Sequence, residues 1–189
     1  MTDTNTTGIE LTHYQGSSLP DGFRELLLRI HTDAYRDQMD DEFIRQFPWF
    51  VDRWSGLPGF TCTIGTDSTG EAVGFAYGAP AVEGREWWRE HLDQAPAASS
   101  TYAVSELMVR PAWRKQGISR LLHDALLADR PEALAVLLVD PDHPQVQKLY
   151  ESWGYKQVGF RQPFADSPRY AVMLRTLSLP ANTGAPGRG

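Results

Sequence analysis

The stretch Val109-Arg-Pro-Ala-Trp-Arg-Lys-Gln-Gly-Ile-Ser-Arg-Leu-Leu122 joins a β-prone run to a segment with helical periodicity. The helical segment carries apolar residues at Ile118, Leu121, Leu122, Ala125 and Leu126. Gly117, in the turn between strand and helix, lets the backbone approach a ligand closely. The first N–H groups of a helix have no partner within it and lie at the positive end of its dipole. The turn is therefore suited to bind a pyrophosphate, and three basic residues add charge there: Arg114, Lys115 and Arg120.

The pattern Arg114-x-x-Gly117-x-Ser119 resembles the acyl-CoA-binding motif of the GNAT superfamily of N-acyltransferases, which is Arg/Gln-x-x-Gly-x-Gly/Ala between a strand and a helix. Ser119 departs from the family pattern, but serine is small enough to leave the approach open. Two further segments, 106–111 and 149–155, resemble family segments at the family spacing. The alternative is a strand–helix turn whose glycine serves only the local geometry and whose arginines are solvated.

The order of the expected elements matches the GNAT arrangement, which implies an α/β fold. The fold would have three layers, with a central mixed sheet of about seven strands flanked by helices. Strands are expected at 9–14, 60–64, 72–77, 101–109, 133–139, 155–160 and 169–177. Helices are expected at about 20–37, 39–55 with an interruption near Pro48, 83–95, 117–130 and 143–153.

The chain has 189 residues, which suits one domain. We expect a single acetyltransferase domain over 8–179, with flexible termini at 1–7 and 180–189. No run approaches the ~20 apolar residues that span a bilayer, so no membrane partner is expected. The polar N-terminus lacks the apolar core of a signal peptide, which favours a cytoplasmic protein.

The composition excludes several classes of function. A net charge of −6 argues against a nucleic-acid partner, which would need a basic face. The single cysteine, Cys62, excludes an intramolecular disulfide and a cysteine-rich zinc site. The five histidines lack paired ligand spacing, so we expect no metal.

The resemblance implies a site for acetyl-CoA as co-substrate. Backbone groups of Leu107, Met108 and Val109 would pair with the pantetheine arm like an added strand. The turn after the motif's Arg114 would hold the pyrophosphate through Lys115, Gln116, Gly117, Ile118, Ser119 and Arg120. His143 stands where the family often has an asparagine that contacts CoA. A solvated histidine beside a helix N-terminus is the alternative for that position.

Two residues are candidates for proton transfer. Tyr150 aligns with the family tyrosine that protonates the departing thiolate, and a phenol with a pKa of about 10 is protonated at neutral pH. Glu106 is the candidate general base, because a carboxylate in an otherwise apolar strand is costly to bury without purpose. The alternatives are packing for Tyr150 and a strand salt bridge for Glu106. A base just before the last helix is not expected, because 137–139 contains no carboxylate.

We therefore expect transfer of an acetyl group from acetyl-CoA to a primary amine of a small molecule or peptide, by direct attack in a ternary complex. A non-catalytic acyl-CoA-binding regulatory module is the alternative. The acceptor side is expected to use aromatic and acidic residues: Asp33, Tyr35, Asp37, Asp40, Asp41, Glu42, Trp49, Phe50, Trp54, and one of Trp87 and Trp88. The sequence does not fix the oligomeric state, and a homodimer stays open.

Overall fold

A computed structural model describes residues 8–177, so the predicted flexible termini lie outside the described residues. Seven strands form one sheet in the order β1-β2-β3-β4-β5-β7-β6. The strands are β1 Glu10–Gln15, β2 Thr61–Thr66, β3 Ala72–Pro80, β4 Thr101–Val109, β5 Leu134–Val139, β6 Lys156–Arg161 and β7 Tyr170–Thr176. The α-helices are α1 Phe23–Ala34, α2 Phe47–Ser55, α3 Ile118–Leu127 and α4 Pro144–Ser152. The predicted α/β class and mixed sheet are confirmed, since β4 and β5 are parallel and the other neighbours are antiparallel.

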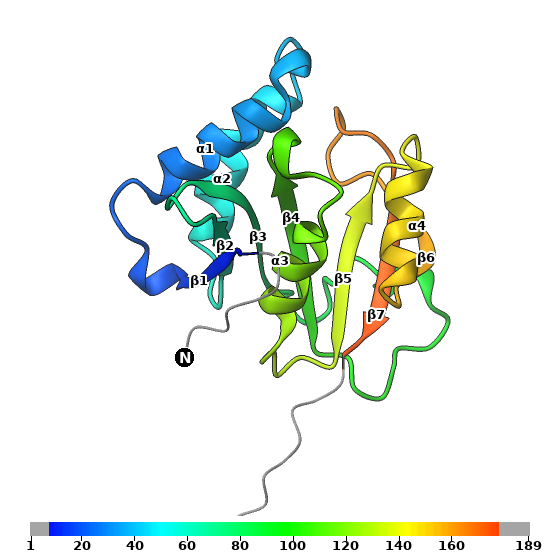
Figure 1. The fold of residues 1–189 in the computed structure, drawn as a ribbon. Coiled ribbons are helices and arrows are strands. Elements are labelled where there is room, and N and C mark those ends of the chain that lie inside the picture. Colours follow the sequence, from blue (N-terminus) through cyan, green and yellow to red (C-terminus); the bar gives the residue numbers. More distant parts are fainter. Residues whose placement is uncertain (1–7, 178–189) are drawn as a thin grey trace, which may run out of the picture.

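The sheet is covered on both faces, and alternate residues of its central strand serve different cores. Val109 belongs to the cluster that packs under α3, whereas Met108 belongs to the cluster that packs under α1 and α2. Successive side chains of a strand point to opposite faces, which explains the division. In Figure 1, α1 and α2 lie over the β1–β4 half of the sheet and α4 lies over the β5–β7 half. The described chain is therefore a three-layer structure.

The central parallel pair separates along its length. β4 pairs with β5 only from Thr101 to Ala103, although β4 continues to Val109 and β5 to Val139. Figure 1 shows the two arrows moving apart toward their carboxyl ends. Beyond the last pair, one edge of each strand is left without a strand partner in the described sheet. Unpaired strand edges offer donors and acceptors to an extended ligand.

A bulge in β4 lies at the place where the strands separate. Tyr77 of β3 pairs with Glu106, whereas the next residue, Gly78, pairs with Val104. Ser105 is thus the extra residue of β4. A bulge twists a strand and redirects the side chains beside it, here that of Glu106.

The helix predicted over 83–95 is wrong. This segment forms turns and only one short 3-10 helix, Arg89–His91. Gly84 has a left-handed φ of +82°, so no helix runs through it, although a helix could begin after it. Trp88 is fully buried, and its indole N–H donates to the Thr101 hydroxyl at 2.9 Å. Tertiary burial of this side chain outweighs the helical pattern.

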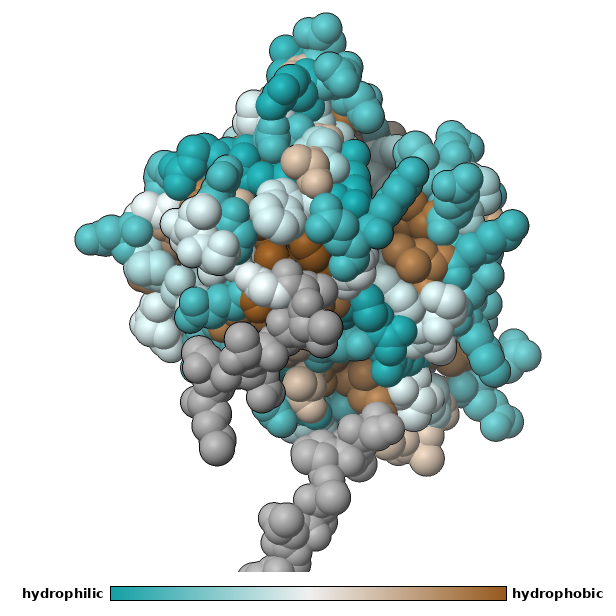
Figure 2. Space-filling view, in the orientation of Figure 1, coloured by the Kyte–Doolittle hydropathy of each residue, from teal (hydrophilic) through white to brown (hydrophobic). Residues whose placement is uncertain are grey.

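The other helices differ from the predictions mainly at their ends. Of the helix predicted over 20–37, only Phe23–Ala34 (α1) is α-helical. Of the helix predicted over 39–55, only Phe47–Ser55 (α2) is α-helical, and Pro48 lies in its first turn instead of interrupting it. Proline is tolerated there because the first N–H groups of a helix have no partner within it. No helix of the described residues is long and apolar enough to cross a membrane. On the face shown in Figure 2, hydrophilic residues predominate and hydrophobic residues surface in small areas.

Candidate active site

The turn between β4 and α3 presents a row of free backbone donors. Among the described residues, no backbone N–H from Lys115 to Arg120 has a backbone acceptor. Gly117 and Lys115 both have left-handed backbone conformations, with φ of +80° and +61°. This geometry leaves the N–H groups unpaired at the N-terminus of α3, where the helix dipole is positive. An anionic group such as a pyrophosphate is suited to this position.

The side chains of the turn mostly have partners of their own. Arg114 donates to the carbonyl oxygens of Val109 at 3.2 Å and of Ala34 at 3.0 Å, which ties the turn to the end of α1. Arg120 pairs with Asp124 one turn along α3. Consequently the free donors of the turn are mainly backbone groups, and Arg114 shapes the turn.

β4 presents free backbone groups to the gap beside β5. Arg110, which follows β4, donates its N–H to the Val73 carbonyl oxygen of β3 at 2.9 Å. Because N–H directions alternate along a strand, those of Leu107 and Val109 face away from β3 and into the gap. Met108 directs its N–H toward β3 and lines the neighbouring cavity instead. Two of the three predicted residues thus offer backbone donors to an extended ligand.

A cavity of about 690 Å³ opens at the carboxyl ends of β4 and β5. Both predicted proton-transfer residues, Glu106 and Tyr150, line it. Its aromatic lining consists of Tyr35, Phe43, Phe47, Phe50, Trp54, Trp87, Tyr150, Phe164 and Tyr170, and its carboxylates are Asp41, Glu106 and Asp140. The cavity is large enough for a small substrate.

Glu106 is a carboxyl group of the cavity with a shifted pKa. Burial raises the pKa of Glu106 to about 8. No ion pair of Glu106 occurs within residues 8–177, so the predicted alternative of a strand salt bridge finds no partner there. A carboxyl with this pKa changes its protonation near neutral pH, as a general base must.

Tyr150 lies in α4 and packs edge-on against aromatic neighbours. Its ring centroid is 5.1 Å from that of Trp153 and 5.7 Å from that of Tyr155. Burial raises the pKa of Tyr150, and the nearby negative charge of Glu106 raises it further. The phenol is therefore protonated at neutral pH and able to donate. Packing and proton donation are compatible here, because the same side chain also lines the cavity.

The loop between β5 and α4 contributes one predicted residue and one that was missed. His143, directly before α4, lines the cavity as an exposed residue. Asp140 follows β5 immediately and also lines the cavity. The sequence interpretation searched only 137–139 for a base before this helix and so missed Asp140. The acidic residue directly after an apolar strand was the available signal.

Part of the predicted acceptor wall is present. Tyr35, Asp41, Phe50, Trp54 and Trp87 line the cavity, whereas Asp33, Asp37, Asp40, Glu42, Trp49 and Trp88 do not. Asp33 instead pairs with Arg36 and Arg110. The sequence interpretation missed further lining residues of α2, of β6 and β7, and of the loop between these strands: Arg53, Arg161, Phe164 and Tyr170.

The loop between β6 and β7 reaches across to α2. Gln46 donates its amide N–H to Asp166 at 3.0 Å. The ring of Phe164 lies 5.9 Å from Trp49 and 5.7 Å from Phe50. This contact closes one side of the cavity. It joins segments that are far apart in the sequence, since Gln46 and Asp166 are separated by 120 positions.

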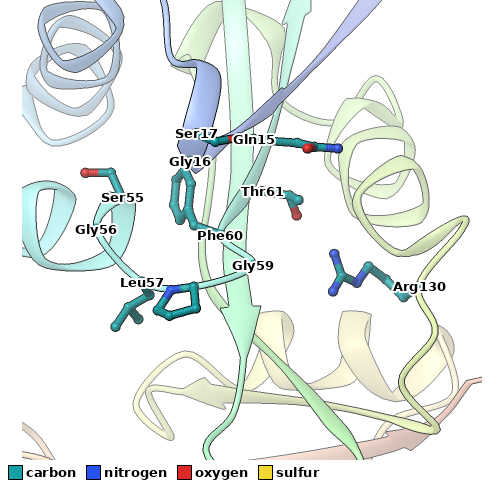
Figure 3. A pocket seen from close by; sticks show the side chains of 11 residues that line it. Gln15, Gly16, Ser17, Ser55, Gly56, Leu57, Gly59, Phe60, Thr61 and Arg130 are labelled. Atoms are coloured by element: carbon teal, nitrogen blue, oxygen red, sulfur yellow. The ribbon is translucent and has the colours of Figure 1, made fainter.

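A second hollow of about 520 Å³ lies elsewhere and is shown in Figure 3. It is bounded by the loop 55–61, by 15–17 and by Arg130. None of the predicted site residues lines it. The Arg130 guanidinium already donates twice to Glu132, at 2.8 and 2.7 Å, so its charge is satisfied within the protein. The candidate chemistry therefore lies in the larger cavity.

No group of three or more His, Cys, Asp or Glu side chains within the described part of the chain is placed to hold a metal ion. Cys62 is fully buried in the core beneath α1 and α2, and burial raises the pKa of its thiol.

Comparison with models of known protein families assigns the chain to a family. The acetyltransferase (GNAT) family model matches residues 21–155, which is most of the chain. The protein belongs to the GNAT family of acetyltransferases. Family membership supports acyl transfer from acyl-CoA to an amine acceptor.

Solved structures share the fold at low sequence identity. The ribosomal-protein-S18-alanine N-acetyltransferase from Escherichia coli is 17% identical, with a TM-score of 0.62, over 93% of this chain and 99% of that one. Ard1 from Thermoplasma volcanium is 14% identical, with a TM-score of 0.61, over 90% and 99% of the two chains. A GNAT-family acetyltransferase from Staphylococcus aureus is 14% identical, with a TM-score of 0.62, over the same shares of 90% and 99%. No curated protein matches the sequence significantly.

Proposed function

We propose that the protein transfers an acetyl group from acetyl-CoA to a primary amine of a small molecule or peptide, by direct attack in a ternary complex. The observation that carries the proposal is that Glu106 and Tyr150 line one cavity, at the edge where β4 and β5 separate. The acetyl group would enter from the strand gap and the amine from the aromatic side of the cavity.

The donor would be held by backbone groups. The six free N–H groups from Lys115 to Arg120 would bind the pyrophosphate. The pantetheine arm would lie along the unpaired edge of β4 and accept hydrogen bonds from Leu107 and Val109. A donor N–H at this edge would also polarise the thioester carbonyl, because it stabilises the oxyanion that develops during attack.

The proton transfers would be divided between two residues. The Glu106 carboxylate would take a proton from the acceptor ammonium, and the free amine would attack the thioester carbonyl carbon. The tetrahedral intermediate would expel the thiolate of CoA, and Tyr150 would protonate that thiolate as the C–S bond breaks. The second nitrogen proton would then restore the Tyr150 phenol, and Glu106 would release its proton to solvent. The products are the amide, CoA thiol and one released proton.

The raised pKa of Glu106 sets the pH range of this mechanism. With a pKa of about 8, most of the carboxyl is protonated at pH 7 in the free protein. The basic form therefore grows as the pH rises toward 8. A bound ammonium would favour the carboxylate, because an opposite charge nearby lowers the pKa of an acid.

The direct experiment measures release of CoA thiol from acetyl-CoA across a panel of amines, with mass-spectrometric detection of the acetylated product. Thiol release that depends on the amine supports the proposal. Tight acetyl-CoA binding without acetylation of any amine would instead support the non-catalytic acyl-CoA-binding module. Absence of acetyl-CoA binding at millimolar concentration would contradict both.

We also propose that residues 8–179 act as a single acetyltransferase domain and that the protein is cytoplasmic. The continuous seven-stranded sheet supports the first proposal. The second rests on the sequence alone. Size-exclusion chromatography with light scattering would decide between a monomer and a homodimer.

A further inference from the structure

Arg161 lines the cavity, and within the described part of the chain its guanidinium has no hydrogen-bond or ion-pair partner. Arg161 is the last residue of β6, pairs in register with Tyr170, and lines the same cavity as Glu106. Its Nε is buried and has no hydrogen-bond partner. Among the described residues, the guanidinium forms no ion pair.

Such an arrangement is costly unless a ligand completes it. A buried donor without an acceptor loses its hydration and gains nothing in return. Some other arginines pair within the protein, as Arg130 does with Glu132 and Arg120 with Asp124. Arg53 also lines the cavity, but it is exposed and stacks over Trp49, whereas Arg161 has a buried Nε without a partner. An anionic group of a ligand would supply the missing acceptor, and a planar carboxylate matches the guanidinium in shape.

The remaining lining requires two more properties of the ligand. The cavity places the carboxylates of Glu106, Asp140 and Asp41 around the same space, which suits an ammonium group. Between these charged groups the walls are aromatic, and the loop carrying Phe164 closes one side against Phe50. An aromatic or large apolar body would pack there.

We propose that the acceptor is a free amino acid with an aromatic or large apolar side chain, and that Arg161 binds its carboxylate. This inference rests on the proposed function. The amine would approach Glu106, the side chain would pack among the aromatic rings, and the carboxylate would receive hydrogen bonds from Arg161. Arg161 is then a specificity-determining residue, since an amine without a carboxylate leaves its donors unpaired.

The test compares amino acids with the amines that lack only the carboxylate. Five pairs suffice: phenylalanine and 2-phenylethylamine, tyrosine and tyramine, tryptophan and tryptamine, leucine and 3-methylbutylamine, methionine and 3-methylthiopropylamine. CoA thiol release is followed at saturating acetyl-CoA. For at least one pair, kcat/KM of the amino acid should exceed that of the amine by about 10- to 100-fold, as expected for a buried charge-assisted hydrogen bond. Equal or better use of the amine in every pair overturns the inference.

The variant Arg161→Gln separates a carboxylate contact from a structural role. It should lower kcat/KM for the amino acid by about 10- to 100-fold, mainly through KM, and leave the paired amine within about twofold. Arg161→Lys should recover part of the loss. The matched control is Arg169→Gln, because Arg169 packs its guanidinium 4.8 Å from the Phe160 ring and does not line the cavity.

Other outcomes have distinct meanings. An equal loss for both members of a pair, or a raised KM for acetyl-CoA alone, overturns the carboxylate contact. Turnover of simple amines with no turnover of any of the five amino acids overturns the inference while the proposed function stands. If no compound is acetylated, calorimetry of each amino acid with the acetyl-CoA complex still decides. Binding that Arg161→Gln weakens supports the inference, and no binding overturns it.

Discussion

His123 of α3 and Tyr155, just before β6, form a buried hydrogen bond of 2.9 Å between Nε2 and the phenol oxygen. The other ring nitrogen, Nδ1, lies 3.0 Å from the Asp124 carboxylate. Because burial lowers the pKa of His123, the imidazole is neutral at pH 7. A carboxylate can only accept, so Nδ1 carries the proton and Nε2 accepts from Tyr155. The bond joins α3, which follows the candidate pyrophosphate-binding turn, to the segment behind Tyr150, whose ring is 5.7 Å from that of Tyr155.

Replacing Tyr155 with phenylalanine should destabilise the protein by about 1–3 kcal/mol, because the buried Nε2 of His123 loses its donor. The free energy of unfolding is measured by urea denaturation. Tyr14→Phe is the matched control, since no hydrogen bond of the Tyr14 phenol occurs among the described residues, and it should change stability by less than about 0.5 kcal/mol. Equal effects of the two substitutions would show that this bond contributes nothing measurable.

The sequence predicted the strand, turn and helix of the candidate donor site because their signals are local. The strand that ends at Val109, the turn around Gly117 and the helix that follows are all continuous in the chain. Hydrophobic periodicity and a glycine between the two periodic segments suffice to place them. Glu106 was singled out as a carboxylate in an otherwise apolar strand, and Tyr150 by the family resemblance.

The acceptor side was harder to predict because tertiary contacts build it. Arg161 and Phe164 reach the cavity only through the pairing of β6 with β7 and the contact of their loop with α2. No local pattern marks these residues. The segment 83–95 also shows that a local sequence pattern does not predict tertiary contacts. The burial of Trp88 against the sheet outweighs the helical pattern of this segment. A short window of sequence gives no information about such a tertiary contact.

Replacing Gly117 with valine should abolish acetyl-CoA binding while the fold survives. Valine is strained at a φ of +80°, so the turn must change its backbone and move the free N–H groups. A Cβ there meets nothing within 4 Å, so the strain stays local. The melting temperature is measured with and without acetyl-CoA, which should stabilise only a protein that binds it.

Gly84→Val is the matched control for Gly117→Val. Gly84 has a φ of +82° and equally open surroundings, but it lies in the segment before β4, away from the turn. It should cost a similar amount of stability, about 1–2 kcal/mol, and keep the shift caused by acetyl-CoA. A normal shift in Gly117→Val would contradict the role of the turn.

Tyr150→Phe should lower kcat by about 10²–10⁴-fold with little change in acetyl-CoA affinity, because it removes a proton donor and little packing. Pre-steady-state measurements should confirm that chemistry limits the rate. Tyr35→Phe is the control, since the Tyr35 phenol lines the same cavity and its pKa is raised to about 12 by burial and by Glu106. If Tyr35→Phe gives the larger loss, the proton donor is Tyr35.

The pKa of Glu106 also predicts how stability changes with pH. The carboxyl has a pKa of about 8 when folded and an ordinary value of 4.5 when unfolded, so the folded state binds more protons between these values. Stability from this group is therefore complete below pH 4.5 and is lost as the pH rises through 8. Relative to wild type, Glu106→Gln should gain stability from pH 5 to 8 in urea denaturation. If the free energies of unfolding of the two proteins change in parallel with pH, the pKa of Glu106 in the folded state is ordinary.

Glu106→Gln should also change the pH dependence of acetyl transfer. In the wild type, kcat/KM should rise with pH up to about 8 as Glu106 ionises. The variant has no base, so its rate should follow the fraction of acceptor that is already neutral. Both rates then rise together below pH 8, and the deficit of the variant should be constant there.

Above pH 8 the wild-type carboxyl is fully ionised, and the deficit should shrink by about tenfold per pH unit until the acceptor itself is neutral. Acetyl-CoA affinity, measured by calorimetry, should be unchanged. A uniform deficit at every pH would point to lost positioning, and no deficit would assign the deprotonation to another group or to bulk water.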